Sequence, residues 1–196
     1  MNKKNCKQEL IDITISIINE NHGDVNKVTI RDITSRSGVS VGLINYHFGN
    51  KDNLIAECVQ KIITKVVMEF KPDMMVGKEL PPFEAAKARL IDSAGKVFDF
   101  FFQYPSISRI SILNDHSHFT NDTNSYYSIK GFSSIIGDAI KNQAKKELIA
   151  FTLASAMQVT FLKAFEDKIF LTYDFSKEED RKRYISDLVN TLMTES

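Results

Sequence analysis

The stretch SGVSVGLINYHFGNKDNL (residues 37–54) decides how the N-terminal part of the chain folds. Gly38 suits the positive φ of a tight turn, and Ser40 is a residue type that caps helix N-termini. We therefore expect a short helix over residues 40–46, following another over residues 29–36. Two short helices joined across a glycine turn have the spacing of a helix-turn-helix.

The residues before this turn predict the rest of a three-helix unit. Thr29 can cap the helix that it opens, and Asp32, three residues later, is a carboxylate at a position that favours a helix start. Residues 6–18 carry apolar side chains every three or four positions, which is helical periodicity, and Gly23 can end that helix. Asn50 can cap a further helix, which we expect to connect to the rest of the chain as far as residue 71.

The helix over residues 40–46 has the composition required of a helix that enters the DNA major groove. Gly42 has no side chain, so its backbone can approach DNA closely, and Asn45 can offer an amide to a base edge. Tyr46 and His47 carry polar tips that can reach phosphates, and Lys51 adds charge where backbone N–H groups are exposed. The predicted DNA-binding residues are Thr29, Arg31, Ser40, Val41, Gly42, Leu43, Asn45, Tyr46, His47 and Lys51.

A buried corner of an ordinary helical domain is the alternative interpretation. It explains Ile44 and Phe48, which we expect in the core, but a glycine in the middle of a buried helix would weaken that helix for no gain.

The order and spacing of these residues, T29-x3-I33-x4-G38-V39-S40-x-G42-x-I44-x2-H47-F48-x2-K51-x2-L54, resemble the signature of the TetR family of bacterial transcriptional regulators. The resemblance covers roughly residues 9–55. It departs from the family pattern at Asn45, where an aromatic residue is usual. It implies a homodimer that binds a near-palindromic operator on double-stranded DNA, and a small-molecule effector held by a C-terminal helical domain. We expect a repressor that a largely apolar effector releases.

The composition is that of a globular protein, with 43% hydrophobic and 26% charged residues. The net charge is zero, so DNA contacts must come from a few well-placed donors. The chain shows no signal peptide and no apolar stretch of membrane-span length, so we expect a cytoplasmic protein with no membrane partner. We interpret Cys6 and Cys58 as small core residues in a reducing compartment.

The chain after residue 72 is helical in pattern almost throughout, which predicts an all-α protein. The predicted domains are a DNA-binding domain over residues 1–50 and an effector-binding and dimerisation domain over residues 51–196, with residues 51–71 as a connecting helix. Further helices are expected near 83–103, 106–114, 125–144, 146–171 and 177–194.

The C-terminal helices carry apolar residues on more than one side, which is more than packing against a single neighbouring surface requires. This surface can pack as a solid core, line a cavity for a ligand, or form a two-fold helical interface. The resemblance favours a pocket and a dimer. The predicted pocket residues are Phe98, Phe102, His116, Met157 and Phe161, and the predicted interface residues are Ala154, Phe165, Tyr184, Leu188 and Leu192.

No metal, cofactor or catalytic site is predicted. The segment Asp115–His118 contains two histidines, but without further ligands nearby we interpret it as a solvated loop. There is no phosphate-binding glycine loop and no nucleophile motif, so we do not expect an enzyme. Two other hypotheses are a regulator controlled by a protein partner, which a solid C-terminal core would favour, and a helical enzyme.

Overall fold

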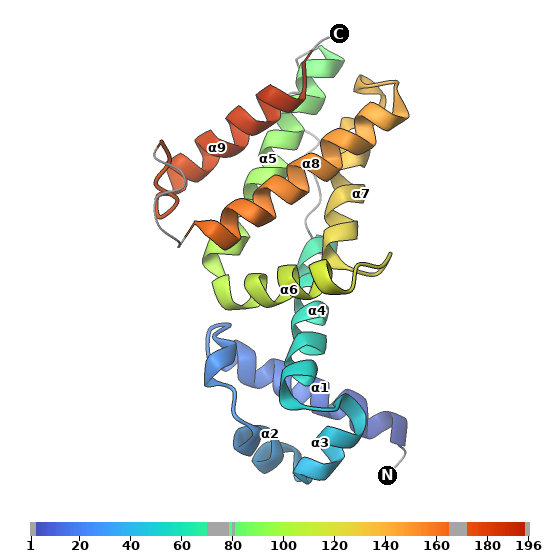
Figure 1. The fold of residues 1–196 in the computed structure, drawn as a ribbon, viewed down its shortest axis with the longest axis vertical. Helices are drawn as coiled ribbons and strands as arrows, with labels where there is room; N and C mark the ends of the chain where they lie inside the picture. Colours follow the sequence, from blue (N-terminus) through green and yellow to red (C-terminus); the bar gives the residue numbers. More distant parts are fainter. Residues whose placement is uncertain (1–2, 70–78, 80, 165–171, 195–196) are drawn as a thin grey trace. The chain divides into compact units, whose positions relative to one another are not determined.

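The computed structural model describes residues 3–69, 79, 81–164 and 172–194 of the chain (Figure 1). Within these residues every regular element is a helix, and no strand is present. The predicted all-α fold, with an N-terminal helix-turn-helix domain followed by a helical domain, is confirmed. None of the helices in this described part has the length and apolar character needed to cross a membrane.

The chain divides into two compact units. The first combines residues 1–66 with residues 104–118, and the second combines residues 67–103 with residues 119–196. The predicted boundary at residue 50 concerns the DNA-binding function, and it stays a prediction. The first unit contains α1 (Lys3–Glu20), η1 (Val25–Lys27), α2 (Ile30–Ser37), α3 (Val41–Phe48), most of α4 (Lys51–Glu69) and α6 (Pro105–Ser117).

Local residue chemistry sets the helix ends of the first unit. After α1, Gly23 adopts a positive φ of 80° and donates its N–H to the Ile18 carbonyl. Gly38 ends α2 with a φ of 66°, in the left-handed region that glycine enters without strain. The Asn50 side chain accepts a hydrogen bond from the Asn53 N–H at 2.8 Å and so caps α4.

The core of the first unit is formed by fully buried aliphatic side chains from four helices. An ion pair between Arg36 and Glu20, 2.6 Å between nitrogen and oxygen, joins the surfaces of α2 and α1. Helix α6 also packs here: its Ile107 side chain lies so close to Gly23 that a Cβ added at Gly23 would be 3.2 Å away from it. The fully buried residues include Leu10, Ile18, Ile33, Ile44, Leu54 and Cys58.

In the second unit, α5 packs against α7, α8 and α9 (Figure 1). These elements are α5 (Pro82–Gln103), α7 (Asn124–Ile136), η2 (Gly137–Ala139), α8 (Gln143–Lys163) and α9 (Glu178–Leu192). An aromatic cluster fills the space between α5, α8 and the start of α9, with Phe98 fully buried at its centre. At its edge, Arg181 of α9 pairs with Asp99 of α5 at 2.6 Å.

The predicted helix over residues 125–144 is wrong in its second half. The α-helix ends at Ile136, because Gly137 takes a φ of 51° and turns the chain into the short 3-10 helix η2. A new helix, α8, then begins at Gln143, and the Asn142 side chain caps it by accepting from the Lys145 N–H at 3.0 Å. The predicted end of this helix, at residue 171, lies outside the described residues.

The predicted solvated loop Asp115–His118 is a second correction. Helix α6 continues to Ser117, so Asp115 is held on the helix and is buried. Its position, seven residues after Ser108 and four after Ser111, puts it on the same buried face of α6. His116 and His118 are exposed, and no group of three or more potential metal-binding side chains occurs in the described residues.

Candidate nucleic-acid interface

Helix α3 is fixed by one apolar face and leaves the other face open. Ile44 is fully buried and Phe48 nearly so, and the Lys7 ammonium lies over the Phe48 ring at 5.1 Å from its centre. On the opposite face Tyr46 is 68% exposed, and Asn45 is exposed beside it. The apolar face of α3 is therefore packed against the core of the first unit, while its opposite face of small and polar residues is accessible to solvent.

Nothing inside the protein requires glycine at position 42. Its φ is not in the left-handed region, and a Cβ added there would meet only the Ser40 hydroxyl, at an ordinary contact distance of 3.7 Å. Glycine in a helix is less favourable than alanine by about 1 kcal/mol. The bare backbone at Gly42 lies on the exposed face of α3, where it leaves room for the close approach of an external group.

The two helix N-termini near this face differ in their caps. The Thr29 hydroxyl accepts from the Asp32 N–H at 3.1 Å and donates to the Asp32 carboxylate at 2.6 Å, so it is occupied within α2. Ser40 stands at the N-cap of α3 with an exposed side chain that makes no capping hydrogen bond. The amide N–H groups that open α3 can therefore bind an external acceptor such as a phosphate oxygen.

The remaining predicted contacts lie around α3. His47 is half-buried, and its ring packs edge-on against Tyr46 at 5.1 Å between centroids. Val41 is exposed at the start of the helix, and Leu43 is half-buried. Lys51, at the start of α4, donates from Nζ to the Val28 carbonyl at 3.1 Å.

Three positive charges of this unit have acidic partners. Arg36 pairs with Glu20, Lys27 with Asp24 at 3.7 Å, and Lys7 with Glu57 at 3.0 Å. By contrast, Arg31 is exposed on α2 and has no ion-pair partner among the described residues. The individual DNA contacts stay predictions.

Four of the five predicted pocket residues lie in the aromatic core of the second unit. Phe98, Met157 and Phe161 are buried, and Phe102 packs against Phe98 and Phe161 with ring centroids 5.1 and 5.4 Å away. His116 belongs to the first unit, where it is exposed on α6. The pocket assignment stays a prediction.

The predicted interface residues divide between the interior and the surface. Ala154 is buried in its own unit, and the Tyr184 hydroxyl hydrogen-bonds the Thr160 hydroxyl at 2.7 Å. Burial raises the pKa of Tyr184. Leu188 and Leu192 are half-buried on α9, and Phe165 lies outside the described residues.

Sequence reasoning missed the exposed apolar residues of α8. Leu148 is 63% exposed, Phe151 56% and Val159 51%, and we name these three residues the α8 stripe. Their spacing of three and then eight places them along one side of a helix. The signal was hidden because α8 is apolar on several sides, and the inward residues have the same character as the stripe.

Comparisons with known proteins agree on one family. Residues 21–58, which include α2 and α3, match the family model described as bacterial regulatory proteins, tetR family. The HTH-type transcriptional regulator BetI of Cronobacter sakazakii (strain ATCC BAA-894) is 34% identical over 95 residues. These residues cover 47% of this chain and 43% of BetI, so the match spans less than half of that curated relative.

Two solved structures share the fold over nearly the whole chain. A TetR-family transcriptional regulator from Streptomyces coelicolor has a TM-score of 0.57 at 18% identity, and the match covers 98% of this chain and 80% of that one. A TetR transcriptional regulator from Rhodococcus sp. RHA1 has a TM-score of 0.52 at 14% identity, with 99% of each chain covered. Residues 21–58 thus match the helix-turn-helix segment of the tetR family in sequence, and the chain as a whole shares the fold of two solved TetR-family regulators.

Proposed function

We propose that the protein is a homodimeric transcriptional repressor that binds a near-palindromic operator and is released by a small, largely apolar effector. The observation that carries the proposal is the open face of α3. Ile44 and Phe48 hold the helix from one side, while Gly42 and Asn45 lie on the other, where the major groove would receive them.

The electrostatics of this face support a small number of aimed contacts. The uncapped N-terminus of α3 offers amide donors at the exposed Ser40, and Arg31 adds a guanidinium without an acidic partner in the described residues. Lys51, at the start of α4 directly after α3, has a half-buried side chain. Its Nζ can exchange the hydrogen bond to the Val28 carbonyl for one to a phosphate oxygen.

The α8 stripe supports the dimer. Three large apolar side chains in a row on one helix are costly to leave in water, and a second copy of the same helix would bury them symmetrically. A dimer would present two copies of α3. If these lie about one DNA turn apart, roughly 34 Å, they read two half-sites of a near-palindrome.

The effector is proposed to act through the second unit by a population shift. A ligand that binds one arrangement of the C-terminal helices more tightly than another would favour a spacing of the two α3 helices that no longer fits the operator. The aromatic cluster around Phe98 suits an apolar effector better than a highly charged one.

Fluorescence anisotropy with labelled duplexes from the DNA upstream of the protein's own gene tests the proposal. We expect at least one duplex to bind 10³-fold or more tightly than a random duplex at the same salt concentration. Equal affinity for all duplexes would refute sequence-specific binding.

Two variants separate base contacts from phosphate contacts. Lys51→Ala should weaken binding to every duplex and reduce the salt dependence by about one counterion. Asn45→Ala should instead change which base is preferred at one position of each half-site, because an amide reads a base edge. A uniform loss with both variants would show that Asn45 does not read a base.

A further inference from the structure

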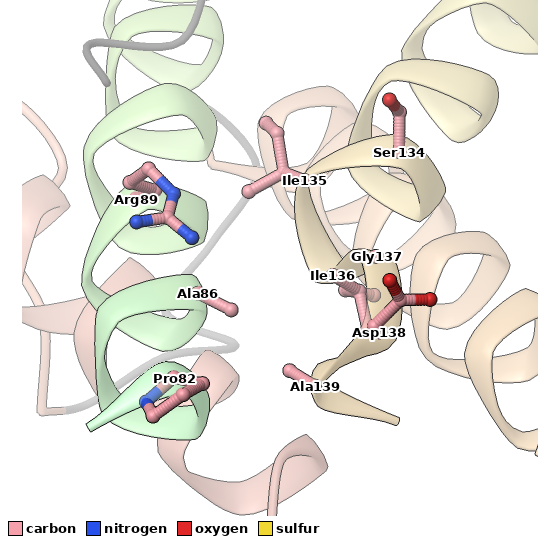
Figure 2. A pocket seen from close by; sticks show the side chains of 9 residues that line it. All are labelled: Pro82, Ala86, Arg89, Ser134, Ile135, Ile136, Gly137, Asp138 and Ala139. Carbon is pink, nitrogen blue, oxygen red and sulfur yellow. The ribbon is translucent and has the colours of Figure 1, made fainter. Parts of the chain in front are cut away.

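The second unit contains a surface groove of about 390 Å³ between α5 and the end of α7 with η2 (Figure 2). One wall is the first half of α5, which contributes Ala86 and Arg89. The facing wall comes from Ile135 and Ile136 of α7, and Asp138 of η2 stands at one end. None of the aromatic residues around Phe98 lines this groove, so it is distinct from the predicted effector pocket.

Arg89 is the polar side chain that gives this groove its chemistry. Figure 2 shows the Arg89 side chain on the α5 wall, and its guanidinium is part of the groove lining. The side chain is half-buried, and within the described part of the chain it has no hydrogen-bond or ion-pair partner. A guanidinium drawn partly out of water beside Ala86 and Ile135 loses hydration without compensation, and a carboxylate would replace that hydration with two parallel hydrogen bonds.

Asp138 does not satisfy Arg89, although both line the groove. The two side chains form no ion pair, and Asp138 is exposed, so water screens its charge. The half-buried guanidinium should therefore dominate the local preference, with Asp138 as a weak opposing charge. The rest of the lining is largely apolar, and Ile136 at its base is almost fully buried.

We propose that this groove is a binding site for a small carboxylate with a short apolar body. The carboxylate pairs with the Arg89 guanidinium, and the apolar body lies against Ala86 and Ile136. A volume of about 390 Å³ is in the range of small-molecule sites, which combine apolar walls with a few placed polar groups. The proposal concerns a ligand site on the second unit, and it does not depend on DNA binding.

Backbone amide chemical shifts of the full-length, ¹⁵N-labelled protein measure this binding directly. The probes are sodium hexanoate, 1-hexanol and hexylammonium chloride, which each contain six carbon atoms and carry head groups of different charge. We expect hexanoate to shift the amides of residues 86–90 and 134–139 saturably, and to bind at least tenfold more tightly than either other probe. Equal effects of all three probes, or hexanoate shifts centred on Phe98 and Phe102, would overturn the proposal.

Two variants give predictions of opposite sign, and a third serves as the control. Arg89→Met keeps the length and removes the charge, so the hexanoate affinity should fall about tenfold. Asp138→Asn removes the opposing charge and should raise the affinity about two- to threefold. Lys87→Met, on α5 but outside the groove lining, is the matched control and should leave the affinity unchanged. Retained affinity in Arg89→Met, or weaker binding in Asp138→Asn, would refute the pairing.

Discussion

Replacing Gly42 with alanine should make the protein more stable and a worse DNA binder. The new methyl group has room in the unbound protein, where its only neighbour would be the Ser40 hydroxyl at 3.7 Å. Alanine is favoured over glycine in a helix, and the unfolded chain also loses conformational freedom. We expect the free energy of unfolding to rise by about 0.5–1 kcal/mol, and the melting temperature by roughly 1–4 °C.

The same methyl group should interfere with DNA. If the α3 backbone at Gly42 lies against the DNA, a methyl group there must push the two surfaces apart. Forcing an extra methyl into a close-packed contact costs about 1–3 kcal/mol, which corresponds to roughly 5- to 150-fold weaker binding. Fluorescence anisotropy on the best upstream duplex, at fixed salt, measures this loss, and urea denaturation measures the gain in stability.

Gly131 provides the matched control. It lies within α7, its φ is not in the left-handed region, and an added Cβ would meet nothing within 4 Å. Gly131→Ala should therefore stabilise the protein to a similar extent without changing DNA affinity. If Gly42→Ala binds DNA within twofold of the parent protein, then α3 does not approach DNA through this face, and the functional reason offered for Gly42 is wrong.

Three further predictions concern the dimer, the helix caps and pH. Phe151→Asp should raise the dimer dissociation constant at least tenfold in analytical ultracentrifugation, because it places a charge in the apolar α8 stripe, whereas Phe119→Asp, at another exposed aromatic, should not. Thr29→Ala should cost about 1 kcal/mol of stability in urea, because it removes a cap, whereas Ser40→Ala, which loses no capping bond, should cost a few tenths. Burial raises the pKa of Cys58 from 9.0 to about 12, so the folded protein keeps a proton that the unfolded chain loses. The free energy of unfolding should then fall above pH 9 by up to about 1.4 kcal/mol per pH unit. A Cys58→Ala variant has no thiol to titrate, so its free energy of unfolding should fall less steeply above pH 9. Parallel pH profiles of the variant and the parent protein would contradict the assignment.

The first unit was predictable because its elements obey local rules. A cap at Thr29, a left-handed glycine at Gly38 and a cap at Asn50 each fix a helix end within four residues of sequence. These signals do not depend on what the helices pack against. The helix boundaries in this region therefore followed from residue types and spacing, as did the buried positions Ile44 and Phe48.

The second unit was less predictable because packing decides its details. Gly137 breaks a helix in a segment that is apolar on both sides of the break, and hydrophobic periodicity gives no sign of that interruption. The α8 stripe has the same residue types as the buried face of α8, so only the folded unit distinguishes inward from outward positions. Arg89 similarly gave no signal in sequence, because its groove is made by residues some 45 positions further along the chain.

Positions where the sequence breaks a local rule without a folding reason are the most informative about function. Gly38 and Gly42 show the contrast within five residues. Gly38 needs its left-handed backbone to end α2, so its presence says nothing about a ligand. Gly42 has ordinary helical geometry and space for a side chain, as Gly131 does, but Gly42 lies on the exposed face of the helix that we propose to enter the major groove. By the same reasoning a half-buried arginine without a partner in the described residues, as at Arg89, marks a site whose counterpart lies outside the chain. Gly42 lacks a side chain where one would fit, and Arg89 lacks an acidic partner in the described residues. We therefore expect a closely approaching surface at Gly42 and a carboxylate at Arg89.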